Sequence, residues 1–334
     1  MARYPRAMEQ RHLGQSGLTV SRLALGTMTW GRDTDQHEAR DQLAIFVEAG
    51  GTLVDTADVY ADGASERVLG ALVGDVVPRD GVVVATKAVS RPGTTRRFDA
   101  SRAHLLASLD QSLTRLGTDY VDLWQLHAWD PQTPLAESLA AADDAVRAGK
   151  VRYVGISNYS GWQTAAAATW QSAVPGRQAL VSTQVEYSLL QRGIEREVVR
   201  AAAEMGMGIL AWSPLGRGVL TGKYRTGTPA DSRAASAHFT EFVRPFMDER
   251  SKGIVEAVIT AASGLGVSPL EVALAWVRDR PGVTAAIVGA RTAAQLKGSL
   301  SVEGLALPEE IRSVLDEISA LPFGYPDHGW NQGH

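Results

Sequence analysis

Short apolar runs alternate with helical hydrophobic periods along most of the chain. Runs rich in aliphatic and β-branched residues occur at 23–26, 52–56, 82–87, 121–127, 151–157, 180–185, 208–213 and 284–289. Between them, apolar residues recur at helical spacing, most clearly at 43–50, 105–116, 135–146, 270–277 and 311–318. The runs are nearly continuous in apolar residues, as expected of strands that are buried on both faces. The alternation therefore predicts a parallel sheet joined by crossover helices.

Eight strand–helix units favour an α/β (β/α)8 TIM barrel. A doubly wound sheet is the alternative, but no G-x-G-x-x-G turn follows the first run. We expect one barrel domain over 1–334, with an N-terminal hairpin at 11–22 that closes the barrel bottom. We also expect a long lid loop after strand 7 (214–250) and a C-terminal helix and tail (321–334). Thr133 before Pro134, and Ser268 with Glu271, are typical helix starts.

Composition narrows the class of protein. The chain has 334 residues, of which 45% are hydrophobic, and a net charge of −4. This excludes a disordered chain and argues against nucleic-acid binding through bulk charge. The absence of cysteine excludes thiolate catalysis and disulfides, and the seven histidines show no metal-ligand spacing. With no apolar leader and no long apolar stretch, the sequence predicts a cytoplasmic protein without a membrane span.

Four polar residues at or just after predicted strand ends carry candidate chemistry: Asp55, Tyr60, Lys87 and His127. In a barrel they converge on the rim where the carboxyl ends of the strands meet. A lysine beside a tyrosine lowers the phenol pKa, and an aspartate keeps the lysine charged. We therefore expect a phenol that exchanges a proton near neutral pH. Each residue alone is more often a cap, a packing residue, a solvated lysine or a core histidine; it is their combination that favours catalysis.

Seven motifs in order resemble those of the aldo-keto reductases, over residues 11 to about 320: LVDTADVY, ATK, DLWQLH, GISNYS, TQVEYSLL, AWSPLGRGVLTGKY and IVGARTAAQL. The subgroup most similar to the chain contains bacterial general-stress reductases and β subunits of voltage-gated potassium channels. The resemblance implies a barrel that binds NADPH/NADP+ along its C-terminal rim. It implies Tyr60 as general acid for carbonyl reduction, with Lys87 and Asp55 tuning it and His127 orienting the carbonyl.

The resemblance also implies a set of cofactor contacts. The nicotinamide amide would meet Ser157, Asn158 and Gln184, and its ring would stack on Trp212. The pyrophosphate would lie along Ser213, Pro214, Leu215, Gly216 and Gly218, with Lys223 and Arg233 nearby. Gly289, Arg291, Thr292 and Gln295 would hold the 2′-phosphate, and the remaining contacts are Gly26, Thr27, Met28, Asp55 and Ser299. Without their neighbours, SPLGRG is simply a Pro/Gly turn and Arg291 a surface arginine.

The chain departs from the subgroup at one point of the cofactor site. Gly298 and Ser299 stand where the subgroup often has acidic and amide residues, which predicts weakened adenine contacts. We expect Met28, Trp30, Tyr60, His127 and Trp129 to line the substrate site.

The sequence leaves three functions open. The first is an NADPH-dependent reductase of an aldehyde or ketone, including sugar-like carbonyls. The second is an NADP(H)-binding accessory or sensor subunit with vestigial catalysis, and the third is a Schiff-base lyase that uses Lys87. The partner expected is a small carbonyl compound, and a homo-oligomer is one assembly that the resemblance allows.

Overall fold

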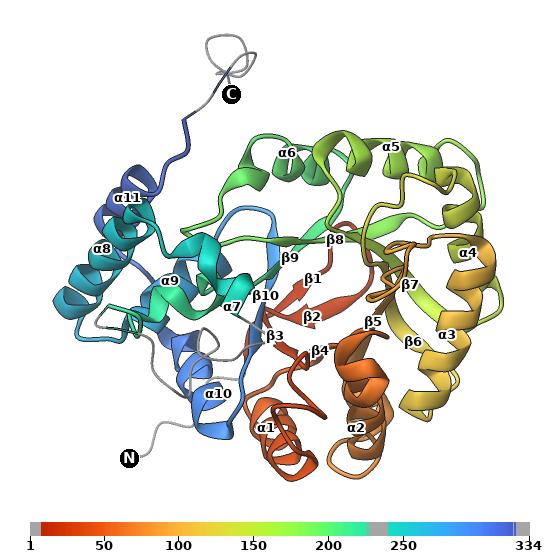
Figure 1. Ribbon diagram of the computed structural model, residues 1–334, viewed down its shortest axis with the longest axis horizontal. Helices are drawn as coiled ribbons and strands as arrows, with labels where there is room; N and C mark the ends of the chain where they lie inside the picture. Colours follow the sequence, from red (N-terminus) through yellow and green to blue (C-terminus); the bar gives the residue numbers. More distant parts are fainter. Residues whose placement is uncertain (1–7, 226, 228–239, 323, 325–334) are drawn as a thin grey trace.

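Parallel strands close into a barrel in a computed structural model that describes residues 8–225, 227, 240–322 and 324 (Figure 1). Within these residues the barrel has eight strands, and β10 closes it by pairing with β3. Each predicted run forms one of them, with its ends within one residue of those expected. The strands are β3 (Leu23–Gly26), β4 (Leu53–Asp55), β5 (Val83–Ala88), β6 (Val121–Leu126), β7 (Val151–Ser157), β8 (Leu180–Glu186), β9 (Gly208–Trp212) and β10 (Val283–Gly289).

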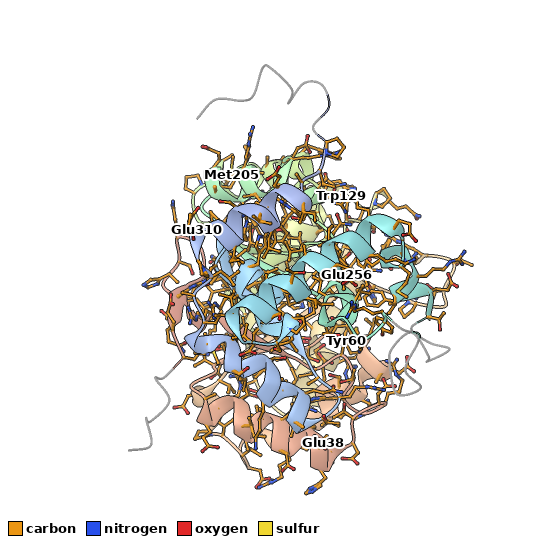
Figure 2. All side chains as sticks on the ribbon, turned by 90° about the vertical axis from the view of Figure 1, so that its left-hand side faces the viewer. Glu38, Tyr60, Trp129, Met205, Glu256 and Glu310 are labelled. Carbon is orange, nitrogen blue, oxygen red and sulfur yellow. The ribbon has the colours of Figure 1, made fainter. Side chains whose placement is uncertain are left out.

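Helices surround the barrel, and their apolar stripes pack against its outer face (Figure 1). Four of the five predicted stripes fall within α3 (Arg102–Leu116), α4 (Leu135–Arg147), α9 (Pro269–Arg278) and α11 (Glu309–Ile318). The stripe at 43–50 begins in α1 (Gln36–Glu48) and extends two residues past its end. The structure adds α2 (Ala64–Leu72), α5 (Gly161–Ser172), α6 (Val198–Glu204), α8 (Glu249–Leu265) and α10 (Ala293–Leu300). Figure 2 shows polar side chains such as Glu256 and Glu310 on the outer helices, so these helices are amphipathic.

One of the two helix-start predictions is confirmed. Ser268 and Glu271 form the predicted capping box of α9. Thr133 is not the N-cap of α4, because Pro134 takes that position. The Thr133 hydroxyl instead donates a 2.6 Å hydrogen bond to the charged carboxylate of Asp130, at Oδ2.

The predicted hairpin is present and closes one end of the barrel. Strands β1 (Gln10–His12) and β2 (Thr19–Ser21) pair antiparallel. Leu13 and Val20, both fully buried, join the apolar cluster inside the barrel. Gly14 lies so close to the backbone of Gly206 that a Cβ atom would be 2.4 Å from its carbonyl oxygen. Because this end is filled, ligands have access from the opposite rim.

The predicted lid region is described in part. It includes the turn η4 (Gly216–Thr221), the short α7 (Thr240–Val243) and the start of α8, while most of 226–239 and of the tail after 322 lies outside the described residues. In the described part of the chain, no single helix is long and apolar enough to cross a membrane; α8 and α9 together pass that test only as a pair bent by 102°.

Candidate active site

Asp55, Lys87 and Tyr60 form one contact chain at the carboxyl ends of β4 and β5. The Lys87 ammonium donates 2.7 Å hydrogen bonds to Asp55 Oδ2 and to the carbonyl of Thr56. It also lies 3.5 Å from the Tyr60 hydroxyl. Lys87 is fully buried, whereas Tyr60 and Asp55 reach the cavity. The rings of Tyr60 and His127 meet edge to face, with centroids 6.1 Å apart. The structure thus brings together the four residues predicted to carry the chemistry.

Lys87 remains charged in this environment. Burial by itself lowers the pKa of Lys87, but the Asp55 carboxylate and the Tyr60 oxygen outweigh it, so that this pKa lies above its ordinary value. A buried, protonated ammonium is a poor nucleophile, and Lys87 is not among the described residues that line the cavity. These features argue against Schiff-base chemistry.

The predicted lowering of the Tyr60 pKa is wrong. Burial raises the pKa of Tyr60 above its ordinary value, and the nearby Lys87 charge, which acts in the predicted direction, offsets this only in part. Tyr60 therefore holds its proton at neutral pH. A protonated phenol beside an ammonium is suited to donate a proton to an oxygen that becomes negative.

His127 is neutral at physiological pH. Burial and the Lys87 charge lower its pKa to about 3, and Nδ1 has no hydrogen-bond partner among the described residues. The backbone of His127 is held by Asn158, whose Nδ2 donates a 2.9 Å hydrogen bond to its carbonyl. A neutral imidazole at this position can hydrogen-bond a substrate oxygen, but it has no second proton to transfer.

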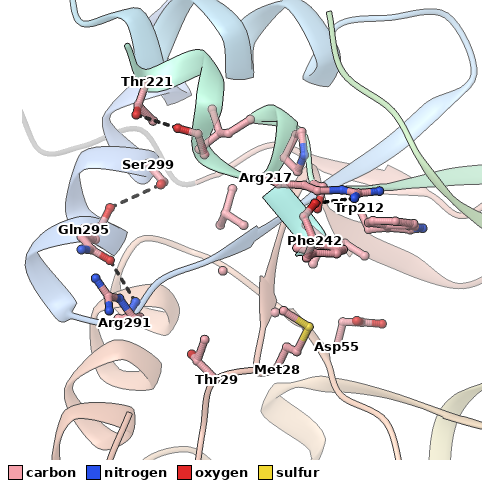
Figure 3. Close-up of a pocket in the computed structure, with 18 of the residues that line it drawn as sticks. Met28, Thr29, Asp55, Trp212, Arg217, Thr221, Phe242, Arg291, Gln295 and Ser299 are labelled. Atoms are coloured by element: carbon pink, nitrogen blue, oxygen red, sulfur yellow. Dashed lines mark hydrogen bonds between the residues drawn. The ribbon is translucent and has the colours of Figure 1, made fainter. Parts of the chain in front are cut away.

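Asp55, Tyr60, Lys87 and His127, here called the tetrad, lie at a cavity of about 570 Å³, the size of a ligand site (Figure 3). Of the predicted cofactor and substrate positions, the following line it: Gly26, Met28, Asp55, Tyr60, His127, Ser157, Asn158, Gln184, Trp212, Ser213, Pro214, Leu215, Gly218, Lys223, Gly289, Arg291, Gln295 and Ser299. Figure 3 shows Arg291 and Gln295 at one end, and Trp212 and Asp55 at the other. The cavity therefore suits an elongated ligand.

Polar groups at the tetrad end fix one another in place. Asn158 adopts a left-handed backbone conformation with φ of 58°, which asparagine tolerates better than most residues. Its Oδ1 accepts a 3.0 Å hydrogen bond from Trp212 Nε1. Gln184 Nε2 donates a 2.8 Å hydrogen bond to Asp55 Oδ1. An amide-bearing ring could thus find donors, acceptors and an indole face here.

Positive charge gathers along the rest of the cavity. Neither Arg291 nor Lys223 has a carboxylate partner among the described residues, and Asp55 is the one carboxylate among the described lining residues. Lys223 Nζ lies 3.4 Å from where a Cβ of Gly218 would be, so the glycine keeps that approach open. These features suit a ligand with phosphate groups.

Some predicted site residues lie elsewhere. The prediction that Trp30 lines the substrate site is wrong. Trp30 is fully buried, and its Nε1 donates a hydrogen bond to Gln42 on α1. Trp129 packs edge to face on Tyr159 and Trp162 outside the cavity wall. The buried Thr27 and Gly216 lie behind the lining, Thr292 caps α10, and Arg233 is outside the described residues.

Arg217 is the most consequential residue that the sequence did not single out. Its guanidinium makes two hydrogen bonds, of 2.7 and 2.6 Å, to the carboxylate of Glu186 and one of 2.5 Å to the carbonyl of Phe242. It also lies 4.0 Å from the Phe242 ring centroid, and Phe242 stacks with Trp212 at 6.4 Å. Arg217 thereby fastens α7 to the rim. In the sequence, the position of Arg217 between the two glycines of SPLGRG is the signal that could have identified it as a site residue. Gly298, singled out in the sequence as a departure from the subgroup pattern, also lines the cavity, and the remaining described lining residues, which carry no chemical pattern, are Thr29, Thr221, Leu270, Ile287 and Val288.

Comparisons with known proteins agree with the barrel fold. The family model described as "Aldo/keto reductase family" matches residues 22–320. An "Uncharacterized oxidoreductase YrpG" of Bacillus subtilis is 36% identical, over 95% of this chain and 98% of its own length. A "Probable voltage-gated potassium channel subunit beta" of Oryza sativa is also 36% identical, over 94% and 96%. A "Versiconal hemiacetal acetate reductase" of Aspergillus parasiticus is 32% identical, over 91% and 95%.

Proposed function

Because the chain belongs to the aldo/keto reductase family and is an NAD(P)-dependent oxidoreductase of that family, we propose that it is an NADPH-dependent carbonyl reductase. Its substrate would be an aldehyde or ketone, including sugar-like carbonyl compounds. The observation that carries the proposal is the buried Asp55–Lys87 pair with the Tyr60 hydroxyl 3.5 Å from the ammonium. This arrangement places a protonated phenol at the cavity wall beside a fixed positive charge.

The residues present fit a dinucleotide with phosphate groups. Ser157, Asn158 and Gln184 would hold the nicotinamide amide, and the indole of Trp212 would support its ring. The backbone of Ser213–Gly218 with Lys223 would bind the pyrophosphate. Arg291 would hold the 2′-phosphate, which favours NADPH over NADH. When bound, the nicotinamide supplies a hydride for the carbonyl carbon.

The side chains around the carbonyl would divide the remaining work. Neutral His127 would donate a hydrogen bond that orients the carbonyl oxygen. Tyr60 would transfer its hydroxyl proton to that oxygen as negative charge develops there. The Lys87 ammonium would stabilise the phenolate that results, and Asp55 would keep Lys87 charged and in position. Proton uptake would then restore Tyr60 for the next turnover.

Activity of purified protein tests the proposal. NADPH with 4-nitrobenzaldehyde should lose absorbance at 340 nm, and Tyr60→Phe should lower kcat by about a hundredfold or more, in the range typical of general acid catalysis. Its cofactor affinity and melting temperature should stay near those of the wild type. Arg40→Ala, which removes an exposed ion pair with Asp75, serves as an unrelated control. Unchanged activity in Tyr60→Phe would remove Tyr60 from its role, and no turnover across a broad carbonyl panel would contradict the proposed function.

A second candidate is an NADP(H)-binding accessory or sensor subunit. The similarity to a probable channel β subunit of Oryza sativa favours it. The complete tetrad favours catalysis, because a binding role alone does not require a buried lysine beside a tyrosine. A stable complex with a partner protein that survives Tyr60→Phe, together with no carbonyl turnover in the wild type, would select this candidate.

A further inference from the structure

Behind the tetrad lies a partly buried ion pair that the mechanism above does not use. Glu66 on α2 is fully buried, and its Oε2 accepts a 2.7 Å hydrogen bond from Arg115 Nε on α3. Its other oxygen, Oε1, accepts a 2.6 Å hydrogen bond from the hydroxyl of Thr86. Thr86 directly precedes Lys87 in β5. The pair is therefore linked to the strand that carries the ammonium.

The same arginine supports the turn that carries Tyr60. This turn, η1 (Tyr60–Gly63), has three successive residues in the left-handed region, at φ of 48°, 52° and 80°. Non-glycine residues rarely adopt such values, so surrounding contacts must hold the turn in shape. Arg115 supplies one of these contacts, because its Cδ lies 2.7 Å from where a Cβ of Gly63 would be.

Close helix packing brings the two partners together. Gly70 of α2 faces the last turn of α3, and a Cβ there would be 2.6 Å from the carbonyl oxygen of Leu116. The glycine therefore lets α2 approach α3 closely enough for Glu66 to reach Arg115. Arg115 also donates to Ser112 Oγ at 3.2 Å, which fixes the guanidinium on its own helix.

We infer that Glu66 and Arg115 are positioning residues that hold the Tyr60 turn against Lys87. Glu66 contacts β5 at Thr86, and Arg115 contacts the turn at Gly63. The separation between the phenol and the ammonium thus depends on an ion pair that touches neither substrate nor cofactor. The inference rests on the proposed function, because it takes Tyr60 as the proton donor.

The test is a double-mutant cycle on reduction of 4-nitrobenzaldehyde by NADPH. Arg115→Met in the otherwise wild-type chain should lower kcat about tenfold, with NADPH Kd and binding stoichiometry unchanged by calorimetry. In the Tyr60→Phe background the same change should have almost no further effect, because the residue through which it acts is gone. Arg115→Lys, which keeps the charge, should recover part of kcat.

Arg79→Met is the matched control. Arg79 is 20% exposed and Arg115 is 18% exposed, and each pairs with one carboxylate at 2.7 Å, but the Arg79 partner, Asp122, lies at the start of β6. This change should leave kcat per bound NADPH unaltered. Should Arg115→Met fail to fold, Glu66→Gln, which preserves the shape of the side chain, replaces it in the cycle with the same expectation.

The outcomes distinguish the positioning role of Glu66 and Arg115 from the proposed reductase function. Full activity in the Arg115 and Glu66 variants, or an equal loss in both backgrounds, overturns the positioning role and leaves the proposed function standing if Tyr60→Phe is impaired. Full activity in Tyr60→Phe overturns both. A loss of binding stoichiometry in step with kcat would mean that the pair only stabilises the fold, which also overturns the positioning role.

Discussion

At the scale of single residues, the loop between Asp55 and Tyr60 holds a carboxyl group in an unfavourable setting. Asp58 Oδ1 is buried and has no hydrogen-bond partner among the described residues. Burial raises the pKa of Asp58 to about 7, the Glu66 carboxylate adds to this effect, and Arg115 opposes it. An unfolded aspartate has a pKa of about 3.9. The folded chain therefore retains a proton that the unfolded chain has already lost.

The raised pKa of Asp58 makes the stability of the fold depend on pH. Because the folded-state pKa is raised, the contribution of Asp58 to stability is fully present below about pH 4 and is lost as pH rises through about 7. Asp58→Asn should remove this loss, so its melting temperature should gain several degrees relative to wild type on going from pH 5 to pH 8.5. Asp62→Asn, in the exposed part of the same turn, is the control. A variant whose difference from wild type is the same at both pH values would contradict this account.

At the scale of elements, the junction of β10 and α10 is where we propose that the 2′-phosphate of NADPH binds. The start of α10 already receives a carboxylate, because Glu38 on α1 accepts a hydrogen bond from the backbone nitrogen of Ala293. The Arg291 backbone nitrogen donates to Gln295 Oε1 at 3.0 Å, which fixes the residue at the cavity end. If a 2′-phosphate binds here as proposed, its attraction would depend on the Arg291 guanidinium rather than on the helix terminus.

Arg291→Ala should consequently weaken NADPH much more than NADH. Loss of charge-assisted hydrogen bonds worth about 1.5–3 kcal/mol raises the NADPH Kd about ten- to a hundredfold. The NADH Kd should change little, since NADH lacks the 2′-phosphate. Calorimetric titration of both cofactors checks this, with Arg40→Ala as the control. Equal weakening of both cofactors would place the 2′-phosphate elsewhere.

The elements also mark where sequence reasoning succeeds. Barrel strands are recognised because burial on both faces leaves continuous apolar runs, and polar residues at their ends, such as Lys87 and His127, stand out against them. The hydrophobic pattern does not predict helix α5, although Ser160 and Gln163 form a capping box, because its alanine-rich face gives little periodicity. The raised Tyr60 pKa and the buried Trp30 depend on how deeply side chains are enclosed, which follows from tertiary packing and not from spacing.

At the scale of the whole molecule, the two ends of the barrel perform separate tasks. The hairpin end is filled with apolar side chains, while the polar groups of the tetrad and the cavity lie at the opposite rim. In barrels of this kind, stability and chemistry can therefore vary independently. Leu13 offers a direct test, because it is fully buried in the interior cluster and belongs to the segment between β1 and β2.

Leu13→Ala should lower the free energy of unfolding by about 2–5 kcal/mol, as deletion of a buried leucine side chain does. NADPH Kd and kcat should remain at wild-type values at temperatures where the protein is folded, because no lining residue moves. Val314→Ala, at a position of α11 that is 57% exposed, should leave stability almost unchanged. If Leu13→Ala instead weakened NADPH binding in the folded state, packing at the closed end would be coupled through the interior cluster to Ile287, which belongs to both that cluster and the cavity wall. The separation of the two ends would then fail along β10, the strand that connects them.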